Sequence, residues 1–180
     1  MECGIDLAVK RKSAVAVLEG KTIEVKFLMT DEELINTCRS ASVVAIDAPL
    51  TYANGFREVD RLLISKGLRV FPPSFIKSLT ERGIRLAKHL RAIETHPTSS
   101  FKLLGWDWRT ISKIKDEADS VISVLTAHLY LEGGTLILRA RDGEIHLLNK
   151  SPRLQKTGEK RYELVETSSL TQWCYTNFTH

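Results

Sequence analysis

Residues 43–50 read VVAIDAPL, and this stretch indicates how the chain folds. Apolar, β-forming residues lead directly into Asp47, and Ala48-Pro49 then ends the extended segment. A carboxylate at the end of a buried strand must be solvated, paired or bound, because burying an isolated charge is costly. Asp47 therefore either forms an Asx-turn into Ala48-Pro49 or belongs to a functional site.

Two further apolar segments run into an acidic residue. The stretch CGID reaches Asp6, and RAIE ends at Glu94. Neighbouring strands lie about 4.8 Å apart, and the carboxyl ends of parallel strands share the sheet edge where open α/β folds place their sites. If the three strands are parallel neighbours, Asp6, Asp47 and Glu94 converge there.

The remaining pattern predicts a mixed sheet with helices on its faces. A hairpin is expected over 13–28 around Glu19-Gly20, and Thr30 or Asp31, with Glu33 behind it, indicates a helix start. Further segments are predicted as helices over 54–67, 75–90 and 115–134 and as a hairpin over 135–148. Residues 149–180 give no firm prediction.

The segment KDEADSVISVLTA predicts a helix with an acidic face. Asp116, Asp119 and Ser123 fall at i, i+3 and i+7, so Asp119 can lie against the sheet edge. Asp116 is better explained by the helix N-terminus, where a negative charge is favoured.

These carboxylates together favour a metal site, although each has a structural alternative, such as Glu94 capping the THP turn. Gathered acids repel unless protonated or bound to a cation, and Mg²⁺ or Mn²⁺ prefers oxygen ligands. Two such ions can assist phosphodiester hydrolysis. We therefore expect Mg²⁺ or Mn²⁺, as two ions.

The net charge of +4 is unevenly distributed. Between residues 55 and 91 there are nine basic and three acidic residues, which suits a phosphate-bearing partner or, equally, a solvated helical surface. Arg57 and Arg61, with Asp60 between them at helical spacing, either bind substrate phosphate or form an internal salt bridge. Trp106 and Trp108 fit buried packing better than base stacking.

Other sequence features limit the class of protein to which the chain can belong. Three cysteines without CxxC spacing indicate neither a disulfide framework nor a zinc site and fit a reducing compartment. An acid precedes the first apolar run, which argues against a secretory signal, and the longest uncharged run, Ser120–Leu131, is too short for a bilayer. We expect a cytoplasmic protein without a membrane span.

The chain resembles the family of predicted nucleases with an RNase H-like fold known as domain of unknown function 429. The matching stretches are GIDLA (4–8), VAIDAPL (44–50), REVDRLL (57–63), AIETHP (92–97) and DEADSVISVLTA (116–127). The resemblance implies an RNase H-like, mixed five-stranded sheet of order 3-2-1-4-5, with helices on both faces and a C-terminal β-hairpin extension. The domain is expected over 1–134, with 135–180 packed on it.

By that likeness, Asp6, Asp47, Glu94 and Asp119 form the catalytic, metal-binding site, with Asp6 bridging both ions. The leading hypothesis is a metal-dependent nuclease that hydrolyses phosphodiester bonds of nucleic acid. The alternative is a nucleic-acid-binding or scaffold protein that kept the fold without turnover. A sugar-kinase-like phosphotransferase would need a second lobe and Gly-rich loops, and neither fits in 180 residues. A homo-oligomer that forms through residues 149–180 is an alternative to a monomer.

Overall fold

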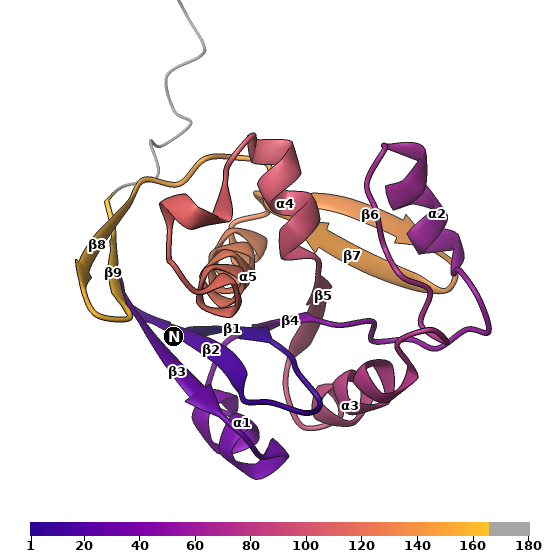
Figure 1. Cartoon of the computed structure of the whole chain (residues 1–180), viewed down its shortest axis with the longest axis horizontal. Helices are drawn as coiled ribbons and strands as arrows, with labels where there is room; N and C mark the ends of the chain where they lie inside the picture. Colours follow the sequence, from indigo (N-terminus) through magenta and orange to yellow (C-terminus); the bar gives the residue numbers. More distant parts are fainter. Residues whose placement is uncertain (166–180) are drawn as a thin grey trace, which may run out of the picture.

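The computed structural model describes residues 1–165 and contains one large mixed sheet with helices on both faces (Figure 1). The strands are β1 (Glu2–Asp6), β2 (Ser13–Glu19), β3 (Thr22–Leu28), β4 (Val44–Asp47), β5 (Ala92–Thr95), β6 (Leu136–Ala140), β7 (Gly143–Leu147), β8 (Leu154–Gly158) and β9 (Arg161–Leu164). The helices are α1 (Asp31–Cys38), α2 (Glu58–Ser65), α3 (Lys77–Ala87), α4 (Pro97–Leu104) and α5 (Lys115–Leu131), with a 3₁₀ turn, η1, at Trp108–Thr110.

The sheet has nine strands in the order β6-β7-β5-β4-β1-β2-β3-β9-β8. The prediction of a five-stranded sheet is therefore wrong in extent, although β3-β2-β1-β4-β5 are consecutive neighbours within it. The hairpin predicted as a C-terminal extension, β6–β7, joins the sheet because β7 pairs with β5 in parallel. A second hairpin, β8–β9, joins the other edge of the sheet, where β9 pairs with β3. The part of the expected extension beyond residue 165 lies outside the described residues.

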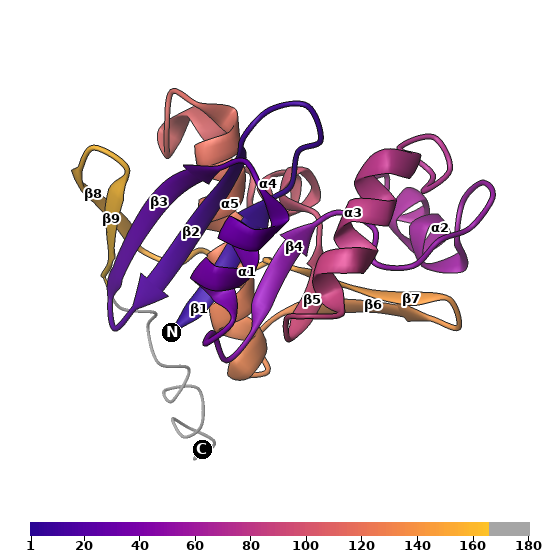
Figure 2. The ribbon, with the colours of Figure 1, turned by 90° about the horizontal axis from the view of Figure 1, so that it is seen from below.

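Helices cover both faces of the sheet. Helix α5 lies across one face with α4 beside it, whereas α1 and α3 cover the other face (Figures 1 and 2). The α5 face holds a core that includes Ala16, Ile23 and Leu125, and the opposite face holds one that includes Ile5, Ile46 and Leu86. The alternation of strand side chains thus divides the apolar residues between two cores.

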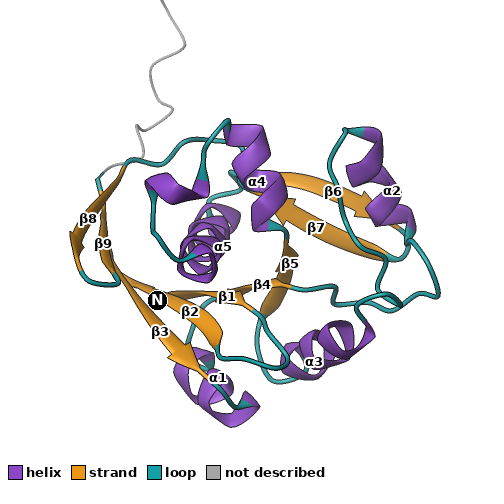
Figure 3. Cartoon of the chain, viewed as in Figure 1, coloured by secondary structure: helices purple, strands orange, loops and turns teal. Residues whose placement is uncertain are grey.

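Local sequence signals explain several helix ends. Thr30 caps α1, and Glu33 completes the capping box, as predicted. Helix α4 was missed by the sequence analysis, although Pro97 lies in its first turn and Gly105 ends it at φ 66° (Figure 3). Trp106 and Trp108 pack against the α5-face core, as expected for buried packing. Within residues 1–165, no helix is long and apolar enough to cross a bilayer.

Candidate metal centre

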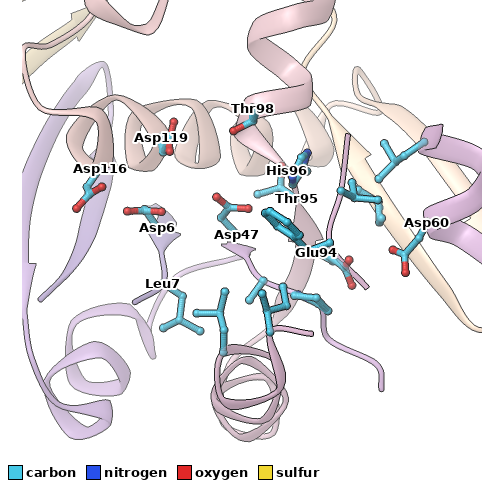
Figure 4. Close-up of a pocket in the computed structure, with 18 of the residues that line it drawn as sticks. Asp6, Leu7, Asp47, Asp60, Glu94, Thr95, His96, Thr98, Asp116 and Asp119 are labelled. Atoms are coloured by element: carbon cyan, nitrogen blue, oxygen red, sulfur yellow. The ribbon is translucent and has the colours of Figure 1, made fainter. Parts of the chain in front are cut away.

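Three aspartates converge at the carboxyl edge of the sheet. Asp6 ends β1, Asp47 ends β4 in the parallel register position directly beside it, and Asp119 projects from α5. One carboxylate oxygen from each lies within 4.8 Å of the others (Figure 4). We call these residues the aspartate triad, and the prediction that they meet is confirmed.

The close approach of α5 brings Asp119 to the sheet. A side chain on Gly4 would place its Cβ 2.0 Å from the backbone nitrogen of Val124 and 2.6 Å from the carbonyl oxygen of Ser120. The backbone of the helix therefore rests directly on the backbone of β1, which no residue except glycine permits. Asp119 precedes Ser120 and so lies beside Asp6, two residues along the strand from Gly4.

The triad has the donor set and the unmet bonding capacity of a cation site. The buried oxygens Asp6 Oδ2 and Asp119 Oδ1 have no hydrogen-bond partner among the described residues. Leaving such groups unpaired costs about 1–3 kcal/mol or more each. Carboxylate oxygens are the preferred ligands of hard divalent cations, so these residues fit a metal ion.

Burial opposes ionisation of the triad. Burial, reinforced by Asp119 and Asp116, raises the pKa of Asp6 to about 7. The pKa of Asp47 is raised well above its usual range by burial and by the neighbouring Asp6 and Asp119. A bound cation would remove this penalty, because it favours the charged form of each carboxylate.

Two basic side chains partly neutralise the cluster. Arg11 pairs with Asp116 and lies 3.8 Å from Asp6, and Lys115 pairs with Asp119. Both side chains are about half exposed, at 57% for Arg11 and 44% for Lys115. A metal ion can therefore compete for the same oxygens while these cations turn toward solvent.

Glu94 was predicted as a fourth ligand but lies outside the triad. It pairs in register with Ile46, not Asp47, so its side chain projects from the opposite face of the sheet. There its carboxylate accepts hydrogen bonds from the Arg57 guanidinium at 2.8 and 2.5 Å and from the Leu50 N–H at 2.8 Å. Figure 4 shows Glu94 directed away from the triad.

Arg57 is an internal salt-bridge residue. Its guanidinium is buried between Glu94 and Asp60 and also donates to the hydroxyl of Thr51. This arrangement corresponds to the second of the two roles considered for it, because little of the guanidinium is left for a substrate phosphate. Arg61 is exposed on α2 and does not line the pocket described below.

Asp116 is a further carboxylate beside the triad, which the sequence analysis assigned to the helix N-terminus. It lies in the first turn of α5 and faces the same pocket as the triad, next to Asp6 (Figure 4). Its spacing of three residues from Asp119 was the available signal. The helix N-terminus was the preferred explanation of its charge, so the sequence analysis did not assign Asp116 to the site.

The triad opens into a pocket of about 330 Å³. His96 and Thr98, at the start of α4, face it (Figure 4). An apolar wall is formed by Leu7, Leu63, Val70, Phe71, Ile76 and Leu79. The pocket therefore combines a charged end that suits a cation and phosphate with an apolar part that suits the body of a ligand.

The basic segment between residues 55 and 91 does not form one surface patch. Arg57 is buried, and Arg82 is buried against Asp31 and the carbonyl oxygens of Ala8 and Met29. Arg91 immediately precedes β5, so it lies at the opposite end of the strand from the triad edge. The excess charge therefore contributes to packing as well as to the surface.

Replacing Asp6 with Asn should stabilise the metal-free protein increasingly as the pH rises. Because the pKa of Asp6 is raised to about 7, the folded state holds a proton that the unfolded chain releases near pH 4. The stability from this proton is complete below the unfolded pKa and is lost as the pH rises to the folded pKa of about 7, a change of about 4 kcal/mol.

Urea unfolding of both proteins in EDTA, at pH about 4.5 and about 8, measures this difference. The lowered pKa of His96, caused by burial and Lys115, acts in the opposite direction but is common to both proteins. A stability difference that does not vary with pH would show that Asp6 titrates normally.

The fold and the site define an α/β protein with a metal-compatible acidic pocket at the carboxyl edge of its sheet. Residues 4–128, from β1 through most of α5, match the family described as "Protein of unknown function (DUF429)". The chain belongs to this family, and the match includes the whole aspartate triad. No curated protein and no solved structure gave a match.

Proposed function

We propose that this protein is a metal-dependent hydrolase of phosphodiester bonds in nucleic acid. The observation that carries the proposal is the aspartate triad at the end of an open pocket, with two buried oxygens that have no hydrogen-bond partner among the described residues. Buried acids that repel one another destabilise a fold, so their convergence is best explained by a cation that they hold.

Mg²⁺ or Mn²⁺ suits this donor set, since the described site offers carboxylates and no cysteine. When bound, such an ion supplies a nucleophilic water and stabilises charge on the phosphate oxygens. The triad would hold a first ion. A second ion would draw on Asp6 and Asp116, because Glu94 is committed to Arg57.

The chain's own residues would position the substrate. Asp6 lies between Asp116 and Asp47 (Figure 4), so it is the residue placed to serve both ions. Lys115 and Arg11, once released from their carboxylates, would contact the phosphate from the solvent side. The apolar wall of the pocket would hold the adjoining nucleoside away from bulk water.

The proposal includes an RNase H-like fold for the inner sheet. The neighbouring strands β3-β2-β1-β4-β5, with acids ending β1 and β4 and a third acid on a covering helix, support it. The hairpins β6–β7 and β8–β9 would then be additions at the two sheet edges. Because that fold hosts several chemistries, the triad rather than the fold carries the functional proposal.

A cleavage assay tests the proposal. Purified protein is incubated with single-stranded, duplex, hybrid and branched nucleic acids in Mg²⁺ or Mn²⁺, and EDTA should stop any cleavage. Cleavage that persists unchanged in Asp6→Asn protein comes from a contaminant. Salt-dependent binding without cleavage of any substrate would replace the enzyme with a binding or scaffold protein.

A further inference from the structure

Two exposed phenyl rings lie beside the pocket that contains the aspartate triad. Phe71 is 64% and Phe75 76% exposed, the highest values among the large apolar residues of the described chain. Their rings stack with centroids 5.7 Å apart and planes inclined by 20°. Phe71 also lines the pocket that contains the aspartate triad. An exposed aromatic pair at such a position indicates a binding surface.

The loop that carries the two rings is held in place. Pro72 and Pro73 restrict its backbone, and the Phe75 N–H donates to the Pro72 carbonyl oxygen at 2.9 Å. The Thr80 hydroxyl donates to the carbonyl oxygen of Pro73 at 3.1 Å, which ties the loop to α3. The rings are therefore positioned before any ligand binds, and little ordering entropy is lost on binding.

A second loop adds aromatic surface next to the pair. The Gly55 N–H donates to the Ser74 hydroxyl at 2.9 Å, so the loop after β4 is fixed to the ring-bearing loop. The loop after β4 carries Tyr52 and Phe56, which are 50% and 39% exposed. Aromatic side chains thus gather on two adjoining loops beside the pocket.

The basic residues that precede the pair in the chain favour a phosphate-bearing ligand. Arg69 lies two residues before Phe71, and Lys66 follows the end of α2. Both side chains are exposed, and neither has a carboxylate within 4.0 Å in the described part of the chain. Flat aromatic faces combined with unpaired basic side chains are the features that bind single-stranded nucleic acid.

We infer that Phe71 and Phe75 form a stacking platform for an unpaired nucleobase, so that the substrate is single-stranded or locally unpaired nucleic acid. This inference rests on the proposed function, because the platform adjoins the pocket where the phosphodiester would be cut. In a duplex the faces of each base are covered by its neighbours, and the rings could not reach them.

Binding can be measured separately from cleavage. Fluorescence anisotropy in EDTA and about 0.1 M salt compares a labelled single strand of about 12 nucleotides with its duplex. The Phe71→Ala/Phe75→Ala protein should bind the single strand at least tenfold more weakly, since each stacked base contributes about 1–3 kcal/mol. Duplex binding should change less than about twofold.

Matched variants separate stacking from general apolar contact. Phe71→Leu/Phe75→Leu keeps the apolar side chains but removes the ring faces and should bind as weakly as the alanine protein, whereas Phe71→Trp should bind as wild type does. If the leucine protein binds the single strand normally, the patch is not a base platform, and an apolar partner surface is the better explanation.

The two proposals fail in different ways. Cleavage that requires Asp6, together with single-strand binding unaffected by the phenylalanine changes, would overturn the platform and leave the nuclease standing. Ring-dependent single-strand binding without metal-dependent cleavage would overturn the nuclease and leave the platform standing.

Discussion

Asp6→Asn protein is expected to cleave nucleic acid at least about 10³-fold more slowly than wild type at saturating Mn²⁺. Asp6 is central in the acidic cluster, with Asp47 beside it on β4 and Asp119 above it on α5. An amide is a weaker ligand and brings no negative charge, so the stabilisation lost at the transition state should reach about 4 kcal/mol. Initial rates on the best substrate of the assay give this ratio.

Two controls make the result specific. Glu132→Gln removes one exposed surface charge at the end of α5, far from the pocket, and should change the rate less than about twofold. In EDTA above pH 7, Asp6→Asn protein should be at least as stable as wild type, because a repelled buried carboxylate has been removed. A variant that is inactive because it is unfolded would show the opposite. Full activity in folded Asp6→Asn protein would refute the assignment.

Gly4→Ala is expected to cost about 3 kcal/mol or more of the free energy of unfolding. The added Cβ would meet the backbone of α5 at Val124 and Ser120, and a backbone atom cannot turn aside as a flexible side chain can. Either α5 moves away from β1 or the strand shifts, and overpacking of this kind commonly costs 1–3 kcal/mol or more. Urea denaturation measures the loss.

Gly134→Ala is the matched control for Gly4. A Cβ there would lie at ordinary contact distance, 3.4 Å from the Leu129 carbonyl oxygen. We expect it to cost less than about 1 kcal/mol. If Gly4→Ala costs no more than this control, the close contact between α5 and β1 does not set the position of Asp119.

If Gly4→Ala protein still folds, its Mn²⁺ affinity should fall about tenfold or more, because Asp119 moves with the helix.

The sequence was sufficient to predict the aspartate triad of the candidate metal centre. Asp6 and Asp47 each follow apolar strand residues, so the pattern predicted a buried charge at each strand end. The helical spacing of Asp119 predicted that its side chain can lie against the sheet edge. These three predictions depended on local periodicity and on one assumption, that the strands are parallel neighbours, which the register of Asp6 with Asp47 confirms.

Glu94 shows where sequence reasoning failed. A shift of one residue in the pairing of β4 with β5 decides which face of the sheet the side chain occupies, and no local signal fixes that register. Arg57 had two equally good roles, since its spacing from Asp60 suits both. The nine-stranded sheet was also beyond prediction, because the pairings of β7 with β5 and of β9 with β3 join segments distant in the chain.

The most direct test of the metal centre is anomalous diffraction from a crystal of the wild-type protein soaked in Mn²⁺. We predict a Mn²⁺ peak coordinated by oxygens of Asp6, Asp47 and Asp119, with Glu94 still bound to Arg57. No Mn²⁺ peak at saturating concentration, or a peak coordinated by Glu94 and not by the triad, would contradict the account.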